Sequence, residues 1–446
     1  MSSSVTRRQQ RRLPLSWGGL FLSLALSLPL PPTSAIAQAP AAQSRTWTDA
    51  QGRTMQATLV RIEGTNAVFQ MANGQALTFP VAKLSAADQS FINTTTTTPP
   101  TASAAAPRPQ AKRAWPASVE VPIRSIEISA IEEEALAKRC IYRSEAFEFL
   151  AQDKLAGSVM KEIARTFEAT RALLMALPWG IDPKPPVDAG RFQAKFYETR
   201  TSYIAEGAPP NSGGVYMSRD RTFRIPFQSL GLVMRGKTWY KDENYTNDTI
   251  IHEITHQLMH DYLAFLPMWV IEGSAEYTEM LPYKAGVFQC AAHERGIKEY
   301  IRQADAQDVT PADINIVTHL KMTEEDWGNI ASQSSSGQFR LYFGSCLLVY
   351  YFCHLDGDGQ GTRFIKYLDK MAEARQAWNT FFANPLVKHD KETGRYSWPS
   401  DKVTAPQQPQ DDDYGLSELG LLLEGRSPEQ LETDVKAGFK RIGVKW

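Results

Sequence analysis

The chain has 446 residues, of which 43% are hydrophobic and 22% are charged, and its formal net charge at pH 7 is −1. This composition is that of an ordinary globular protein, and the length exceeds what one compact domain normally needs. Because no basic stretch is concentrated enough to suggest nucleic acid as a partner, the sequence argues against a nucleic-acid-binding protein.

The N-terminus has the three parts of a secretory signal peptide. Four arginines at positions 7, 8, 11 and 12 precede an apolar run over residues 13–30, and a small-residue cleavage site follows at residues 34–38. This pattern predicts that residues 1–37 are removed by cleavage near Ala37, and that the protein is exported to the periplasm or the medium of a bacterial cell. No later stretch approaches roughly 18 apolar residues, so we expect no stable membrane span after cleavage.

Residues 44–92 are predicted to form a compact unit of short strands, with a hairpin turn at Asn73-Gly74. The R-x-W-T-D-x-x-G-R opening at Arg45 and the V-x-K-L-S-x-x-D-Q close at Gln89 resemble the Sla-homology domain, an SH3-like β-barrel. The resemblance implies a protein partner for this domain, whereas a passive targeting or spacing role stays open. Residues 93–116 are rich in Thr, Pro and Ala and predict a flexible linker.

The most informative motif is the HEITH sequence at residues 252–256. Two histidines four residues apart on a helix face the same side, about 6 Å apart along the axis, so His252 and His256 could bind one zinc ion. Glu253 is placed to take a proton from a metal-bound water, which is the chemistry of the HExxH signature. A pair of hydrogen-bonded core histidines is the alternative. The helix is predicted to be mostly buried because its apolar residues form a stripe at Ile251, Ile254, Leu258 and Tyr262.

A catalytic zinc ion normally has a third protein ligand. Met259 and Tyr262 stand where the metzincin class has Gly and His, which excludes that class. Residues 269–277 read W-V-I-E-G-S-A-E-Y and resemble the W-x-x-E-G-x-A-E segment of gluzincins. The resemblance implies that Glu272 is the third ligand and that Glu276 fixes the tautomer of the first histidine. A solvated helix acid remains the alternative for Glu276.

Residues 117–400 are predicted to form the metal-binding domain, with a mixed sheet and a helical C-terminal lobe. The domain resembles uncharacterised bacterial peptidase-like domains of the gluzincin type. Tyr342 could hydrogen-bond an oxyanion in such a site, or could be a core tyrosine. An edge strand at residues 214–217 could pair with an extended peptide substrate. Strands are expected before the HEITH helix, at residues 192–197, 213–217 and 223–227.

Three other polar features of the sequence are predicted to have structural roles. His260 would lie about 12 Å along the helix axis from His252, too far to share its metal. The three glutamates at 132–134 predict a solvated helix face. Residues 356–361 resemble the start of a calcium loop. The twelfth position counted from Asp356 is Tyr367, where such a loop requires a bidentate Glu, so we expect a turn instead.

The four cysteines of an exported chain predict two disulfides, for which three pairings are open. Cys346 and Cys353 fall in one predicted helix, about 10 Å apart along its axis, and cannot bridge each other directly. Each is therefore expected to pair with Cys140 or Cys290.

The sequence as a whole predicts an α+β protein: an SH3-like barrel, a linker, a gluzincin-like zinc metallopeptidase domain, and a polar stretch with a C-terminal helix at 401–446. The expected cofactor is Zn²⁺, and the expected activity is cleavage of peptide bonds in a peptide or protein substrate by a zinc-activated water, with Glu253 as the general base. The alternative is a catalytically silent zinc fold that acts as an envelope-binding or scaffold protein through its SH3-like domain.

Overall fold

A computed structural model describes residues 45–63, 66–71, 76–85, 88–89, 113–242, 244–389, 396–406 and 413–446. They belong to two compact units, a small one within residues 32–112 and a larger one that contains residues 113–446. The predicted signal peptide, and the predicted linker up to residue 112, lie outside the described residues. Among these residues no helix is both long and apolar enough to cross a bilayer.

The small unit is an antiparallel sheet built around a buried tryptophan. Trp47 packs on Phe69 at 4.8 Å between ring centroids, and its indole nitrogen donates a hydrogen bond to the Ala57 carbonyl. A single bridge joins Asp49 to Leu84, so the described strands do not close into the expected barrel, which needs continuous pairing between its first and last strands. The sheet order follows the chain: β1 (Arg45–Thr48), β2 (Thr54–Glu63), β3 (Asn66–Met71) and β4 (Ala76–Pro80).

The larger unit begins with a mixed six-stranded sheet, which confirms the α+β class. The strands β8, β9 and β11 run parallel, and the outer strands are antiparallel to their neighbours. The order across the sheet is β10 (Val215–Met217), β11 (Thr222–Pro226), β9 (Phe192–Tyr197), β8 (Phe147–Ala151), β7 (Arg139–Arg143) and β6 (Ser129–Glu134).

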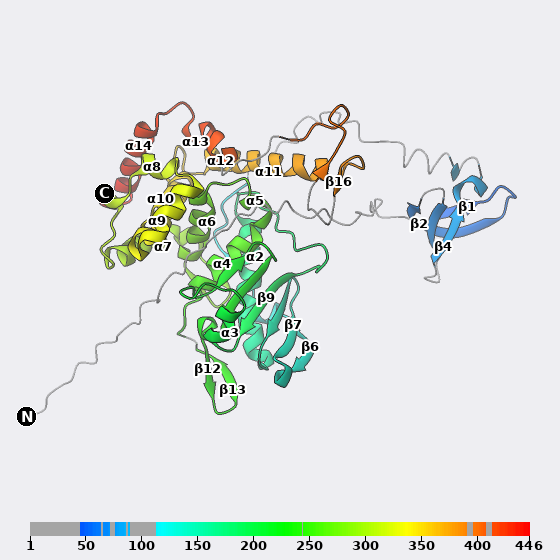
Figure 1. Cartoon of the computed structure of the whole chain (residues 1–446), viewed down its shortest axis with the longest axis horizontal. Coiled ribbons are helices and arrows are strands. Elements are labelled where there is room, and N and C mark those ends of the chain that lie inside the picture. The colour runs from blue at the N-terminus through cyan, green and yellow to red at the C-terminus, as the bar shows by residue number, and fades with distance from the viewer. Residues whose placement is uncertain are drawn as a thin grey trace, which may run out of the picture. The chain divides into compact units, whose positions relative to one another are not determined.

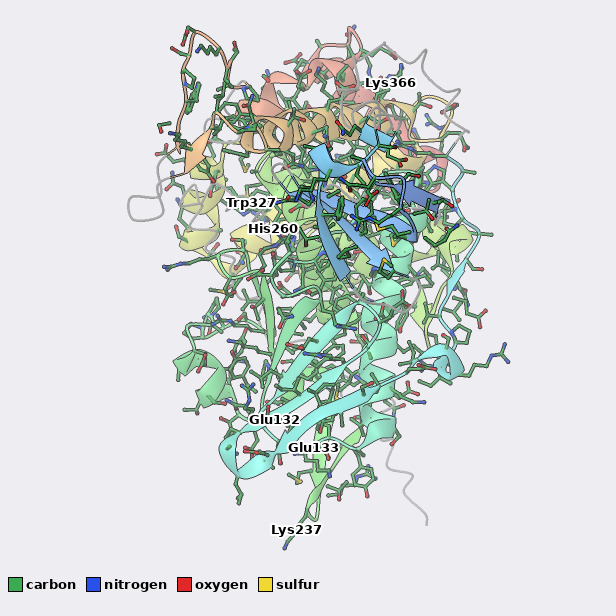
Figure 2. All side chains as sticks on the ribbon, turned by 90° about the vertical axis from the view of Figure 1, so that its right-hand side faces the viewer. Glu132, Glu133, Lys237, His260, Trp327 and Lys366 are labelled. Atoms are coloured by element: carbon green, nitrogen blue, oxygen red, sulfur yellow. The ribbon has the colours of Figure 1, made fainter. Side chains whose placement is uncertain are left out.

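The glutamate run at 132–134 lies on the edge strand β6, so the predicted helix is wrong there (Figure 2). Glu132 pairs with Arg139 on the adjacent strand, and Glu133 pairs with Lys154, each at 2.7 Å. Charges on an edge strand discourage pairing with another chain. A run of glutamates is therefore as compatible with an edge strand as with a solvated helix face.

Two helices pack against this sheet and against each other, α2 (Gly157–Ala176) and α4 (Asp248–Leu258) (Figure 1). The interface with α2 is aromatic: Phe167 meets Phe147, Phe149 and Phe223 edge to face, with centroids 5.1 to 5.4 Å apart. Behind α4 lie α6 (Met268–Met280) and then α10 (Ser335–His354). The HEITH motif is therefore on a helix enclosed between the sheet and a second helical layer.

The C-terminal lobe is helical, as predicted. Its last helix begins with a capping box at Ser427 and packs on α10, where Arg426 pairs with the buried Asp356 at 3.0 Å. Residues 356–361 form the predicted turn between α10 and α11, with positive φ at its three glycines. The helices are α7 (His293–Asp305), α8 (Ile316–Leu320), α9 (Glu324–Gln333), α11 (Thr362–Phe382), α12 (Asp413–Ser417), α13 (Gly420–Leu423) and α14 (Pro428–Arg441).

The expected disulfides are absent from the structure. Cys140, Cys290, Cys346 and Cys353 are all free thiols, and all four are buried in the main core. They pack as small apolar side chains there, and burial raises the pKa of Cys346 well above its ordinary value. An even count of cysteines indicates pairing only if the fold brings two sulfurs to bonding distance.

Candidate metal centre

The helix α4 carries the HEITH motif into the core. Its predicted apolar stripe is confirmed, because Ile251, Ile254 and Leu258 are buried, and Tyr262 is buried in the next short helix, α5 (His260–Leu263). The spacing of four residues turns both histidines the same way. The Nε2 atoms of His252 and His256 lie 3.1 Å apart.

The helix α6 brings Glu272 to the same point. The chain turns at Pro267, and α6 begins at the next residue and crosses α4, where Thr255 and Thr278 share a hydrogen bond of 2.7 Å. Gly273 allows α6 to pack tightly on α10, since a Cβ there would lie 2.4 Å from the carbonyl oxygen of Ser345. The glycine that follows Glu272 thus fixes the depth at which the carboxylate sits.

The three groups fit a metal ion. The Oε2 atom of Glu272 lies 3.3 Å from Nε2 of His252 and 3.3 Å from Nε2 of His256. Tetrahedral zinc with bonds of 2.0–2.1 Å requires ligand atoms about 3.3 Å apart, which matches the spacing of all three pairs. Glu272 is fully buried, and neither of its oxygens accepts a hydrogen bond from any described residue. Such a carboxylate needs a positive partner at that point.

The electrostatics of the centre favour positive charge. Burial tends to raise the pKa of Glu272, but His256 and His252 outweigh it and lower that pKa to about 2. Burial tends to lower the pKa of His252, yet the carboxylates of Glu272, Glu276 and Glu279 raise it well above the ordinary value. The carboxylates therefore favour a positive charge at the two imidazoles, which either a proton or a metal ion would supply.

Glu253 stands beside this group and faces the edge of the sheet. Its Oε2 atom accepts a hydrogen bond of 2.7 Å from the backbone amide of Tyr216, which lies on β10. Burial raises the pKa of Glu253, and the two nearby histidines only partly offset this effect. The prediction of an edge strand at residues 214–217 beside the motif is confirmed.

The second ring nitrogen of His252 is held by a residue that the sequence reasoning missed. Its Nδ1 atom forms a hydrogen bond of 3.1 Å with Glu279, whereas the predicted residue, Glu276, lies 3.3 Å away and accepts a 2.5 Å bond from Tyr300. Burial, together with Glu276, raises the pKa of Glu279 to about 8. The spacing in the sequence could have indicated Glu279. Glu272, Glu276 and Glu279 are at i, i+4 and i+7, which places them on one face of α6.

Tyr342 lies on α10, close to the motif. Its ring centre is 6.0 Å from that of His252 and 5.9 Å from that of Trp327 on α9, and the side chain is buried. Burial, with Glu272 nearby, raises the pKa of its phenol well above the ordinary value, so the group keeps its proton and can donate it in a hydrogen bond. Both sequence interpretations of Tyr342, the oxyanion donor and the core tyrosine, agree with this place.

His260 is separate from the ligand group. Its Nδ1 atom shares a hydrogen bond of 2.8 Å with the hydroxyl of Tyr216, and burial lowers its pKa to about 3. This separation from the ligand group agrees with the prediction that His260 does not share the metal site.

No known family model matches this chain, and no curated protein matches it in sequence. The resemblances to the Sla-homology and gluzincin families therefore depend on the motifs themselves.

Proposed function

We propose that the protein is an exported zinc-dependent hydrolase, and that its substrate is a peptide bond. The observation that carries the proposal is the meeting of three buried ligand atoms, from His252, His256 and Glu272, at mutual distances of 3.1 to 3.3 Å. Two imidazoles and one carboxylate are a ligand set typical of catalytic zinc, which keeps its fourth position open. Zinc held there would supply Lewis-acid chemistry for the attack of water on a carbonyl.

The other residues divide the remaining tasks. Glu253 would accept the proton of the attacking water and return it to the leaving amine. The bond from the Tyr216 amide orients that carboxylate. Glu279 would accept a hydrogen bond from the Nδ1–H group of His252, and this tautomer leaves Nε2 free to act as a ligand. The phenol of Tyr342 would donate to the oxygen that gains negative charge during attack.

The sheet edge supports a peptide as the substrate. The strand β10 is one of the two edge strands of the sheet, among the described strands it pairs with β11 alone, and its amide at Tyr216 points to Glu253. An extended peptide can add to such an edge by backbone hydrogen bonds, which would lay its carbonyl groups beside the metal ligands.

A second candidate is a silent zinc fold that serves as an envelope-binding or scaffold protein through the small N-terminal unit. The burial of the site favours it: His252 and Glu253 are only 4% and 7% exposed, and His256 and Glu272 are no more than 1% exposed. A hydrolase must open this region to admit a substrate, whereas a structural zinc site is closed.

One screen separates the two candidates. The purified chain is incubated with a mixed peptide library in the presence of zinc, and in parallel with a chelator. The proposal predicts new peptide ends only in the zinc sample, and none with His256→Ala. Absence of zinc-dependent cleavage in a protein that still binds zinc would favour the silent fold. Products shortened stepwise from one end would indicate an exopeptidase.

A further inference from the structure

A two-stranded hairpin of the larger unit carries features that the proposed hydrolase chemistry does not use. Among the described strands, β12 (Leu232–Arg235) and β13 (Thr238–Lys241) pair only with each other and form a separate small sheet. Lys237 stands at the tip of this hairpin (Figure 2). The turn is tight, because Gly236 before it has a φ of +64°.

The inner face and the base of the hairpin are fixed to the domain. Trp239 meets Phe227 edge to face at 4.9 Å, and its indole nitrogen donates a hydrogen bond of 2.8 Å to Asp153. At the base, the Lys241 ammonium donates to Asn247, the residue before α4, at 3.0 Å. The hairpin is therefore a firm projection joined to the start of the HEITH helix.

Several apolar side chains on and next to the hairpin are exposed. Val233 lies opposite Tyr240 in the register of the two strands, and they are 39% and 45% exposed. Met234, which lies opposite Trp239 in the register, is 43% exposed, and Tyr245 just beyond the base is 38% exposed. Four of the thirteen exposed large apolar side chains among the described residues thus lie within residues 233–245. Such a concentration marks a surface that binds something.

The charges of the hairpin all have one sign. Residues 232–241 contain Arg235, Lys237 and Lys241 and no acidic residue, and Asp242 and Glu243 follow directly in the sequence. The guanidinium of Arg235 lies over the ring of Tyr240, at 5.6 Å from its centre, and neither Arg235 nor Lys237 forms an ion pair with a described residue. A tyrosine and aliphatic side chains flanked by unpaired cations match the interface of an anionic bilayer, where the apolar groups enter the headgroup region and the cations meet phosphates.

We propose that the β12–β13 hairpin docks the protein on an anionic lipid surface. The size of the patch favours lipid over a protein partner: a stable protein interface buries about 800 Å² on each side, whereas this projection offers only a few side chains. Binding to a bilayer requires no complementary shape, and a small apolar tip with adjacent cations is enough for it. Because the base joins the residue before α4, docking would hold the metal centre near the membrane.

The test is co-sedimentation of the full chain with vesicles. The wild type should bind vesicles made of equal parts of phosphatidylglycerol and phosphatidylcholine, bind those of phosphatidylcholine alone far more weakly, and bind less as salt increases. Arg235→Gln with Lys237→Gln should weaken binding by about fivefold for each charge. Val233→Ser with Met234→Ser should weaken it as well.

Matched controls come from other exposed positions. Lys366→Gln with Lys388→Gln removes the same charge, and Val187→Ser with Met175→Ser removes similar apolar surface, and both should bind as the wild type does. Thermal unfolding checks that each variant is folded. Equal binding to neutral vesicles, no binding to anionic ones, or unchanged binding by folded hairpin variants would each overturn the proposal.

Discussion

Two histidine pairs of the larger unit have opposite surroundings. His252 and His256 meet edge to face, with their Nε2 atoms 3.1 Å apart and a carboxylate beside them. His293 and His354 instead stack nearly parallel, with ring centres 3.7 Å apart. One ring nitrogen of each forms a hydrogen bond with a tyrosine hydroxyl. The bonds are 2.9 Å from Tyr277 to His354 and 3.0 Å from Tyr350 to His293.

The electrostatics of the pairs differ in the same way. Carboxylates raise the pKa of His252 despite its burial, whereas burial, with His293 alongside, lowers the pKa of His354 well below its ordinary value. The first pair attracts positive charge and the second excludes it. Proximity of two histidines is thus not enough to indicate a metal site: what matters is whether their nitrogens converge on an unpaired anionic oxygen.

The largest expected effect is loss of the metal from the first pair alone. His256→Ala removes one of three ligands, and we expect zinc content to fall from about one ion per chain to near zero. His293→Ala is the matched control and should keep the full amount. Elemental analysis of both purified variants checks this. Equal zinc in the wild type and in His256→Ala would place the metal elsewhere.

A smaller effect should distinguish the two carboxylates behind His252. Because Glu279 forms the hydrogen bond to Nδ1, Glu279→Gln should weaken zinc affinity by about 10- to 100-fold. Glu276→Gln should weaken it less, since that side chain is bound mainly by Tyr300. Competition with a chromophoric chelator measures both constants. A larger loss for Glu276→Gln would restore the role that the sequence assigned to it.

The stacked pair should make the protein sensitive to acid. The pKa of His354 is lowered in the folded state, so the unfolded chain takes up this proton first, near pH 6.5. The stabilisation is present above that pH and is lost as pH falls through it, by at most about 1.4 kcal/mol per pH unit for this one group.

Urea unfolding with a chelator present, at pH 7 and pH 5, tests this difference. His354→Gln keeps an acceptor for Tyr277 without the titrating group, so it should lose less stability than the wild type between these two pH values. Identical losses in the two proteins would show that His354 contributes nothing to the acid response.

The smallest expected effect concerns the thiols. Cys140, Cys290, Cys346 and Cys353 are free and buried, so labelling under non-reducing conditions should find four thiols per unfolded chain and close to none in the folded protein. Labelling of fewer than four in the unfolded chain would show a bridge that the structure lacks.

The sequence predicted the part of the site that depends on local periodicity. A spacing of four residues is enough to align His252 with His256, and the segment after it indicated Glu272. The choice between Glu276 and Glu279 could not be made this way, because it depends on how α6 crosses α4 and on Tyr300, which comes from the distant helix α7.

The predictions that the structure contradicts share a physical origin. The glutamates at 132–134 carry no apolar period, so nothing local distinguishes a strand edge from a helix face. Whether two cysteines meet, and whether four strands close into a barrel, depends on contacts between distant segments. Strands and helices were predicted well where the apolar pattern was strong, as on β9 and α10.

The central claim, that the HEITH centre is a hydrolytic one, is tested most directly by Glu253→Gln. The substitution keeps the shape of the side chain and removes the proton acceptor without touching the three ligands. We predict zinc content and thermal stability near those of the wild type, and hydrolysis of a library-derived peptide reduced by about a hundredfold or more. Glu272→Gln, the control, should weaken zinc binding as well. Full activity of a zinc-loaded Glu253→Gln protein would contradict the mechanism.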